Sequence, residues 1–498
     1  MAAQDPKRDK VDMAAAIATD QHTSLGLPAG TGVAGRTSSL ASDYRTVMVA
    51  GAISAAIVAG MALDLAPLTI GAAFAAFLAG IVSPPTGLAI LAFMAPLRPP
   101  LVIPAPGLNA LLVGATVLGC VYRLPLDRPT IRVPAPLLLL LGFVAYVSLQ
   151  QLPELLSGYS GDVGHLVGYN FGQLLTSVGL IIAAAYVLRG RSPGPFVAIA
   201  LVSAFIAAIL ALATFGHPAV GPLSNLVGTS NAVARAVGPF GDPNYFAVYQ
   251  ASAIATALAW MAVVRSRRAR LLLFGTSMVL ASTFAVSLSR GGLLALVAGL
   301  VALAFTRSRR TGAIALLVAV ALIAVAYPVY VQWRVTADTS GASAQAYAGL
   351  AQSDQARLGA ALAAPQLFAT SPLFGIGFSH FSFMSGWYVG FPIESHDWYL
   401  NVLAEEGMVG VALWIPMLAA VAVALHRVSR SARTVGYAVL VTYAVGCATL
   451  QPPDSFQTSA LTALVIVATL VGNWTEVPTA YRSHQTSGRA RDERRSRA

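Results

Sequence analysis

The stretch SLSRGGLLALVAGLVALAFTRSRR, residues 287–310, shows how this chain is built. A run of apolar and small residues, 291–306, lies between one arginine, Arg290, and a cluster of three at 307–310. Runs of about 17–21 such residues recur along most of the chain, the length that a helix needs to cross roughly 30 Å of hydrocarbon. An apolar run that ends in a basic cluster is typical of a membrane span with a cytoplasmic end.

The composition of the whole chain also indicates a membrane protein. Of its 498 residues, 56% are hydrophobic and 10% are charged, and the mean hydropathy is +0.71. Soluble domains carry about 25% charged residues, so this chain has too few to build a water-exposed surface. We predict an all-α, polytopic transmembrane helical bundle with about 12–14 spans in the lipid bilayer.

The remaining composition excludes other classes of site. The formal net charge of +11 comes from arginines between apolar runs and in the C-terminal tail, a pattern that sets membrane orientation and predicts no nucleic-acid partner. Cys120 and Cys447, the only cysteines, lie in apolar runs and predict neither a disulfide framework nor a thiolate metal site. No motif with metal-ligand spacing occurs, so no metal and no cofactor are expected.

The apolar runs define the predicted domain organisation. Residues 1–44 are predicted to be a disordered cytoplasmic arm, 45–474 the transmembrane domain, and 475–498 a basic cytoplasmic tail. Pro84 and Pro85 separate the second and third spans, which could instead form a re-entrant pair. The candidate spans are 47–63, 67–83, 85–97, 108–122, 134–152, 171–188, 195–214, 244–263, 271–288, 291–306, 312–332, 407–426, 434–450 and 458–473.

Basic clusters predict which joints face the cytoplasm. The clusters at 265–270, 307–310 and 426–433 each join two spans and are therefore expected inside. Counting spans from these clusters puts three segments together on the extracytoplasmic face. They are residues 215–243, the joint at Arg290, and a long outer loop, 332–406, expected to carry short helices.

Arginine on the extracytoplasmic face is unexpected, because the positive-inside pattern disfavours it there. Arg290 stands beside the amides of a helix start, which suits an anion, although an interfacial arginine also reaches lipid phosphate. In RAVGPFGDPNYFA, residues 235–247, Asp242 is expected to cap a helix that begins at Pro243. That cap leaves Arg235 unexplained.

The outer loop contains a predicted amphipathic helix, residues 354–368. Leu358, Ala361 and Leu362 fall on one side of it, so the helix could lie on the membrane surface or cover a cavity. Arg357 stands at its expected start, where a cation opposes the helix macrodipole. This position indicates an anionic partner.

The stretch ESHDWYLNVLAEEG, residues 394–407, contains the candidate base. Ser395 is the expected N-cap, which would put His396 in the first helical turn. The helix dipole there disfavours the imidazolium, whereas Glu394 and Asp397 favour it. His396 would then titrate near neutrality, as a general base requires, although a surface histidine in a loop is the alternative.

The sequence defines the roles of the other residues of this stretch less closely. Trp398 and Tyr399 suit either an interfacial aromatic belt or stacking on a sugar. Glu405 and Glu406 stand at a helix end, where a carboxylate needs a compensating cation or ligand.

Four motifs, within about residues 230–425, occur in an order that resembles the O-antigen ligase and polymerase superfamily. They are RAVGPFGDPNYFA, SLSRGG, ARLGAALAAPQLFATSPLFGIGFSHF and SHDWYLNVLAEEGMVGVALW. The resemblance implies a glycosyltransferase of the bacterial plasma (inner) membrane that acts on its extracytoplasmic face. Such an enzyme takes a glycan from a polyprenyl diphosphate carrier and joins it to a glycan, lipid or protein acceptor, without metal or nucleotide.

The resemblance also implies roles for individual residues. Arg290 and Arg357 match the essential arginines of the family, and His396 matches its essential histidine. Arg235 matches the arginine before the G-x-F-x-x-P-N turn and is a third candidate for binding diphosphate. Asp397 stands where many relatives have asparagine. The candidates for tuning the histidine or contacting the acceptor are Glu394, Asp397, Tyr399 and Glu405.

Two alternatives remain open at the level of sequence. A polysaccharide polymerase of the same superfamily would use the same donor chemistry, because acceptor recognition lies in the variable outer loop. A lipid-linked glycan transporter or flippase is expected to place ionisable residues inside its spans, where this chain has almost none.

Overall fold

The computed structural model describes residues 33–97, 107–127, 134–158, 161–215, 226–227, 235–339, 343–390 and 394–474. The described residues divide after Arg45 into two units, and helix packing is described for the second unit alone. In the described residues every regular element is helical, which confirms the predicted all-α class. The predicted tail and residues 1–32 of the predicted arm lie outside the described residues, and helix α2, Val33–Ala62, begins within the arm segment.

The helices follow the apolar runs of the sequence. The first half contains α3 (Ala66–Val82), α4 (Pro84–Met94), α5 (Gly107–Asp127), α6 (Ala135–Gln150), α7 (Leu152–Leu156), α8 (Gly161–Val187) and α9 (Gly194–Ala213). The second half contains α10 (Pro243–Val263), α11 (Arg267–Ser287), α12 (Arg290–Arg307), α13 (Arg309–Thr339), α14 (Ser343–Thr370), α15 (Phe381–Met384), α16 (Gly386–Val389), α17 (Trp398–Glu405), α18 (Gly407–Arg427), α19 (Arg430–Cys447) and α20 (Phe456–Val471). Short 3-10 helices occupy Gly238–Phe240 and Pro452–Asp454.

Eight helices in the described residues are long and apolar enough to cross a membrane, so the chain is a multi-pass membrane protein. They are Tyr44–Ala62, Gly107–Leu126, Gly164–Val187, Gly194–Ala213, Pro243–Val263, Arg267–Ser287, Arg290–Arg307 and Gly407–Arg427. The four shorter apolar helices are α3, α4, α6 and α20. The total of 12–14 spans stays a prediction.

Serine side chains mark where several of these helices begin. Ser266, Ser289, Ser429 and Ser455 precede α11, α12, α19 and α20, and each side chain accepts a backbone N–H of the first turn. A helix start leaves backbone N–H groups without intrahelical partners, and a serine oxygen satisfies one of them. The starts of these helices are therefore local properties of the sequence.

Close packing between α12 and α19 fixes which helix ends lie together. A Cβ atom added to Gly299 of α12 would collide with Thr442 of α19, and one added to Gly291 would collide with Thr449 beyond the end of α19. The two helices are therefore antiparallel. Gly446, at the end of α19, also lies against Val248 near the start of α10, which brings the starts of α10 and α12 to the end of α19.

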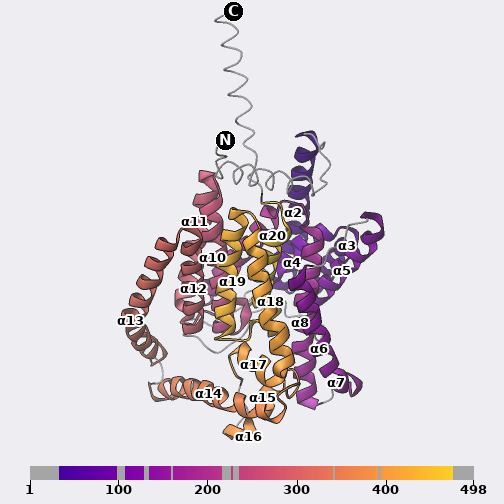
Figure 1. The fold of residues 1–498 in the computed structure, drawn as a ribbon. Coiled ribbons are helices and arrows are strands. Elements are labelled where there is room, and N and C mark those ends of the chain that lie inside the picture. Colours follow the sequence, from indigo (N-terminus) through magenta and orange to yellow (C-terminus); the bar gives the residue numbers. More distant parts are fainter. Residues whose placement is uncertain are drawn as a thin grey trace, which may run out of the picture. The chain divides into compact units, whose positions relative to one another are not determined.

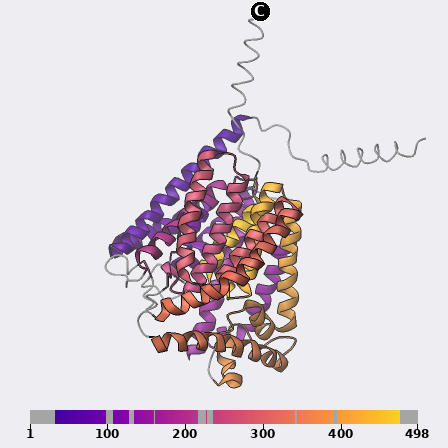
Figure 2. The ribbon, with the colours of Figure 1, turned by 90° about the vertical axis from the view of Figure 1, so that its left-hand side faces the viewer.

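The helices of the predicted outer loop gather at this same end. Figure 1 shows α14, α15, α16 and α17 together at the lower end of the bundle, and Figure 2 shows α14 lying across that end. A hydrogen bond from the Trp398 N–H to the Leu450 oxygen (3.2 Å) ties α17 to the segment after α19.

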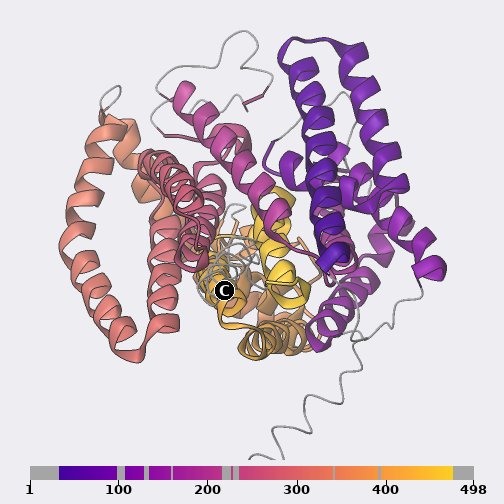
Figure 3. The ribbon, with the colours of Figure 1, turned by 90° about the horizontal axis from the view of Figure 1, so that it is seen from above.

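Seen from above, α13 lies beside α12, away from α3 and α5 (Figure 3).

The predicted helix of the outer loop forms, but its predicted start is wrong. Helix α14 begins at Ser343, so Arg357 lies in its middle, where no exposed helix terminus opposes the cation. Its buried side carries Ala360, Ala363, Ala364 and Leu367, which pack with Phe381 and Ala404. Leu358, Ala361 and Leu362 share the exposed side of the helix, as predicted, and the two leucines are 61% and 58% exposed.

The contact between α12 and α19 yields a test of the packing. We expect Gly299→Val to destabilise the protein by about 1–3 kcal/mol, because the added atoms collide with Thr442 and approach the Ala438 oxygen (3.0 Å). Gly275→Val in α11 is the matched control, since nothing lies within 4 Å of an added Cβ there. Thermal unfolding in detergent measures both variants. Equal melting temperatures would contradict the close approach.

Candidate active site

The loop before α10 is held by Arg235. Its Nε donates to the Ser287 oxygen (2.8 Å) and one Nη donates to Asn244 Oδ1 (3.1 Å), so it joins the loop to the end of α11. Asp242 caps α10 as predicted, because its Oδ1 accepts the N–H groups of Asn244 (2.6 Å) and Tyr245 (3.0 Å). The loop thus approaches the start of α12 in a defined position.

Arg290 is the first residue of α12 and is half-buried. Ser289, the N-cap, accepts the Gly292 N–H (3.2 Å) and donates to Asn244 Oδ1 (3.1 Å). Asn244 therefore connects the Arg235 loop with the Arg290 turn. A Cβ at Gly292 would lie 2.7 Å from the Ala247 side chain, so α12 approaches α10 closely at this glycine.

The structure corrects the local position of His396. The N-cap of α17 is Asp397, whose carboxylate accepts the N–H groups of Tyr399 (2.9 Å) and Leu400 (3.1 Å). Ser395, the predicted cap, instead accepts a hydrogen bond from Gln451 Nε2 (2.9 Å). A carboxylate is the stronger acceptor for N-terminal amides, so α17 begins two residues later than predicted. His396 lies before the cap, with a left-handed φ of 49° that few non-glycine residues adopt.

Neighbouring Glu394 and charges from two other segments act on His396. Burial lowers its pKa, Glu394 raises it, Arg357 lowers it and Asp242 raises it. Its Nδ1 lies 3.9 Å from the Glu394 carboxylate, and the side chain is 31% exposed. The structure thus brings the predicted base, Arg357 of α14 and the cap of α10 into electrostatic range. The part played by Asp242 was not predicted, because its sequence position indicated only a helix cap.

The aromatic residues of this segment anchor α17. Trp398 is fully buried against Trp414 of α18, with ring centroids 5.4 Å apart and planes at 64°. The Tyr399 hydroxyl donates to the Ala444 oxygen (2.9 Å) of α19. Trp398 is therefore a packing residue, and the predicted belt or stacking role does not apply to it. Any contact between Tyr399 and an acceptor stays a prediction.

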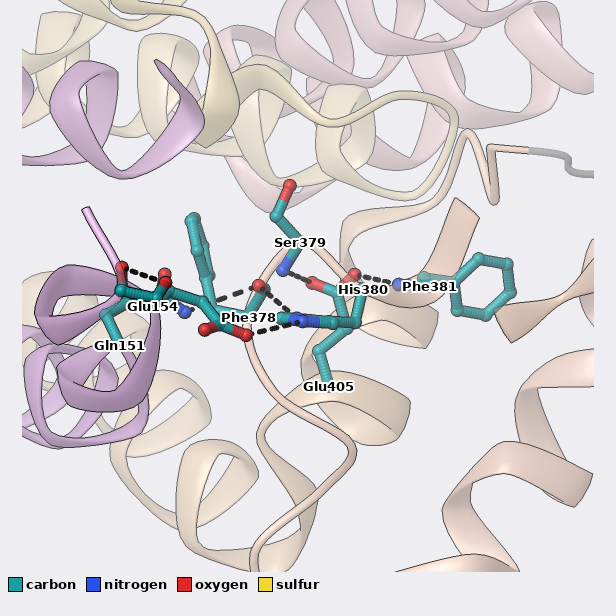
Figure 4. A network of polar contacts seen from close by, with 8 residues as sticks. Gln151, Glu154, Phe378, Ser379, His380, Phe381 and Glu405 are labelled. Atoms are coloured by element: carbon teal, nitrogen blue, oxygen red, sulfur yellow. Dashed lines mark hydrogen bonds and ion pairs between the residues drawn. The ribbon is translucent and has the colours of Figure 1, made fainter. Parts of the chain in front are cut away.

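Glu405 lies at the other end of α17, about 12 Å from its start, so the structure does not bring it to His396. It is buried, and its two carboxylate oxygens accept the N–H groups of Ser379 (2.8 Å) and Phe381 (2.7 Å), as Figure 4 shows. Burial raises the pKa of this carboxyl group to about 7, while the two N–H groups act in the opposite direction. The backbone amides of Ser379 and Phe381, just after the GIGF segment, are the compensation that the sequence could not identify.

A second ionisable pair beside this network was not predicted. His380 Nε2 lies 3.3 Å from the Glu154 carboxylate, and its Nδ1 is 3.0 Å from the Phe378 oxygen. Asn170 donates to the Ser379 hydroxyl (2.6 Å). These contacts join the outer helices to α7 and α8 (Figure 4). No sequence signal points to the pair, because Glu154 and His380 are more than 200 residues apart.

The helices define a multi-pass membrane protein in which Arg357 and Asp242 act on His396 at one end of the bundle. Residues 275–415 match the sequence model of the family described as O-Antigen ligase. This similarity to the O-antigen ligase family covers Arg290, Arg357 and His396 and leaves out Arg235. No curated protein matches the chain.

The buried carboxylate yields a test of the loop. We expect Glu405→Gln to destabilise the protein by about 1–3 kcal/mol, since the amide nitrogen of glutamine cannot accept the second N–H. Because the folded pKa of about 7 lies above the usual 4.5, the stabilisation from Glu405 is full below pH 4.5 and falls as the pH rises through about 7. The difference in melting temperature between wild type and variant should therefore be larger at pH 5 than at pH 8.

The exposed carboxylate of Glu394 provides the control, and Glu394→Gln should change the melting temperature little at either pH. A Glu405→Gln protein as stable as wild type at pH 5 would show that its two hydrogen bonds do not hold the loop.

Proposed function

We propose that the chain is a membrane glycosyltransferase that moves a glycan from a polyprenyl diphosphate carrier to an acceptor hydroxyl. We place the reaction on the extracytoplasmic face of the bacterial inner membrane. The observation that carries the proposal is that the charges of Arg357 and Asp242 reach His396, at the end where α10 and α12 begin. The family match over residues 275–415 supports the same class of reaction.

His396 acts as the general base in this mechanism. Burial favours its neutral form, which is the form that accepts a proton. It takes the proton of the acceptor hydroxyl as that oxygen attacks the anomeric carbon of the donor glycan. The bond from this carbon to the diphosphate oxygen breaks, and the diphosphate leaves with the electron pair. One in-line displacement inverts the configuration at the sugar carbon.

Arginines hold the charge of the leaving diphosphate. Arg290 and Arg357 are assigned to its oxygens, because a guanidinium stays charged and donates two parallel hydrogen bonds to a phosphate. Such groups stabilise the charge that develops in the transition state, so no metal enters this mechanism. Arg235 adds positive charge at the same end while its bonds to Ser287 and Asn244 hold the loop.

Substitutions at these positions test the mechanism in a host deletion strain, with glycan attachment and chain length as the readout. We expect His396→Ala to lower product formation by about 10²–10⁴-fold, the usual contribution of a general base. Arg290→Ala and Arg357→Ala should each lower it by about 10²–10³-fold through lost charge stabilisation. Full activity in the His396→Ala variant would show that His396 is not the general base.

The matched controls are His426→Ala and Arg268→Ala, which change exposed residues at joints of the bundle remote from His396. Both should keep wild-type activity. In the inactive variants, accumulated long lipid-linked glycan indicates a ligase, whereas accumulated single repeat units indicate a polymerase. Membrane extracts establish that each variant protein is present at the wild-type level.

The pH dependence of the reaction tests the electrostatics of His396. Burial and Arg357 lower its pKa, so the base should remain neutral, and the enzyme active, below the usual histidine pKa of about 6.5. Glu394 raises that pKa, so Glu394→Gln should shift the acidic limb of kcat/KM to lower pH. A shift to higher pH, or none, would contradict the role of Glu394.

A further inference from the structure

A cavity of about 680 Å³ lies between α6, α8, α18, α19 and α20, apart from the candidate active site. Its walls are chiefly aliphatic, with Leu140, Val178, Val421, Ala463 and Ile466 among them. Cavities of about 300–1,000 Å³ with such walls are the usual size of small-molecule sites. The composition of the wall fits a hydrocarbon chain better than a glycan.

The dimensions of the cavity agree with a membrane lipid. Its wall includes residues of α18 from Trp414 to Arg427, a distance of about 20 Å along the helix axis. One leaflet of a bilayer contributes about 15 Å of hydrocarbon, half of the roughly 30 Å core. A fatty acyl chain lying parallel to α18 would therefore fill the cavity lengthwise.

The charges at the two ends of the cavity differ. Among the described residues that line it, Arg427 is the only charged one, and it lies at the end where α18 stops. Arg433 donates to the oxygen of Val428 (3.3 Å), a lining residue, so a second cation lies near this end. The opposite end has neutral polar groups, including Trp414 and Ser459. Basic groups between transmembrane helices attract anionic lipid headgroups.

The polyprenyl diphosphate carrier fits this cavity less well than a membrane lipid does. Leu440 and Tyr443 of α19 line it, whereas Thr442 on another side of α19 contacts Gly299 of α12. Arg290, assigned to the diphosphate, begins α12 on that other side. A carrier with its diphosphate there would have to pass α19 to reach the cavity.

We propose that this cavity binds an anionic phospholipid, with one acyl chain between α6, α8, α18 and α20 and the phosphate at Arg427. The lipid fills apolar space that would otherwise separate α18 from α8 and α20. Its headgroup lies at the end of α18, where His426 precedes Arg427.

The test uses the purified full-length chain in nanodiscs that contain equal amounts of phosphatidylglycerol and phosphatidylcholine. Native mass spectrometry after release from the disc measures which lipid remains bound. We expect phosphatidylglycerol to be retained preferentially. Arg427→Gln should reduce this preference about fivefold, the effect expected from one arginine at a membrane surface. Arg430→Gln, which changes an exposed neighbour outside the cavity wall, should leave it unchanged.

A second pair of variants tests whether the acyl chain of the lipid lies in the cavity. Ala463→Phe fills the cavity and should abolish lipid retention, whereas Ala419→Phe, on an exposed side of α18 outside the wall, should not. If Ala463→Phe elutes as an aggregate, Ala420→Phe fills the same cavity from α18 and replaces it.

Three outcomes would overturn the proposal. Equal retention of the two lipids would exclude an anionic headgroup site. Undiminished phosphatidylglycerol on the cavity-filling variant would place the lipid elsewhere. Loss of glycan transfer by that variant, with phosphatidylglycerol still bound, would assign the cavity to the donor chain. Glycan transfer by the wild-type chain is measured separately, so failure of the proposed function does not affect this test.

Discussion

Hydrocarbon offers no hydrogen-bonding partner, so a chain in a bilayer must satisfy its backbone groups internally. This constraint makes the described elements of the chain helical and confines irregular backbone to the ends of the bundle. Leu288, Ser379 and His396 have left-handed backbones, and their segments lie where α12, α15 and α17 begin. The end where these three segments lie is also the end where Arg357 and Asp242 act on His396.

Short helix α17 is held in place at that end by buried contacts with the rest of the bundle. Trp398 fixes its start against Trp414, and Glu405 fixes its far end by accepting two backbone N–H groups of the preceding loop. The Asp397 cap then leaves His396 just outside the helix. The candidate base is therefore positioned by buried contacts of its neighbours, and its own side chain stays partly exposed to a substrate.

Polar and apolar sites are separated across α19 in this protein. The face of α19 toward α12 packs through Gly299 and Thr442, near the helix start that presents Arg290. The other face borders an apolar cavity whose one charged wall residue, among those described, is Arg427 at the remote end of α18. The same helix thus supports two environments, one suited to transfer chemistry at a surface and one suited to a lipid chain.

The sequence alone determined the helical class, the approximate positions of the long apolar helices and the Asp242 cap, because these depend on apolar runs and on local hydrogen bonds. It also indicated His396, Arg290 and Arg357 as candidates, through motifs that resemble those of one family. Only the tertiary structure decided that Arg357 and Asp242 act on His396, that Asp397 caps α17, and that Glu405 binds the amides of a distant loop. Those contacts join segments tens to hundreds of residues apart, and helix periodicity carries no information about which ends will meet.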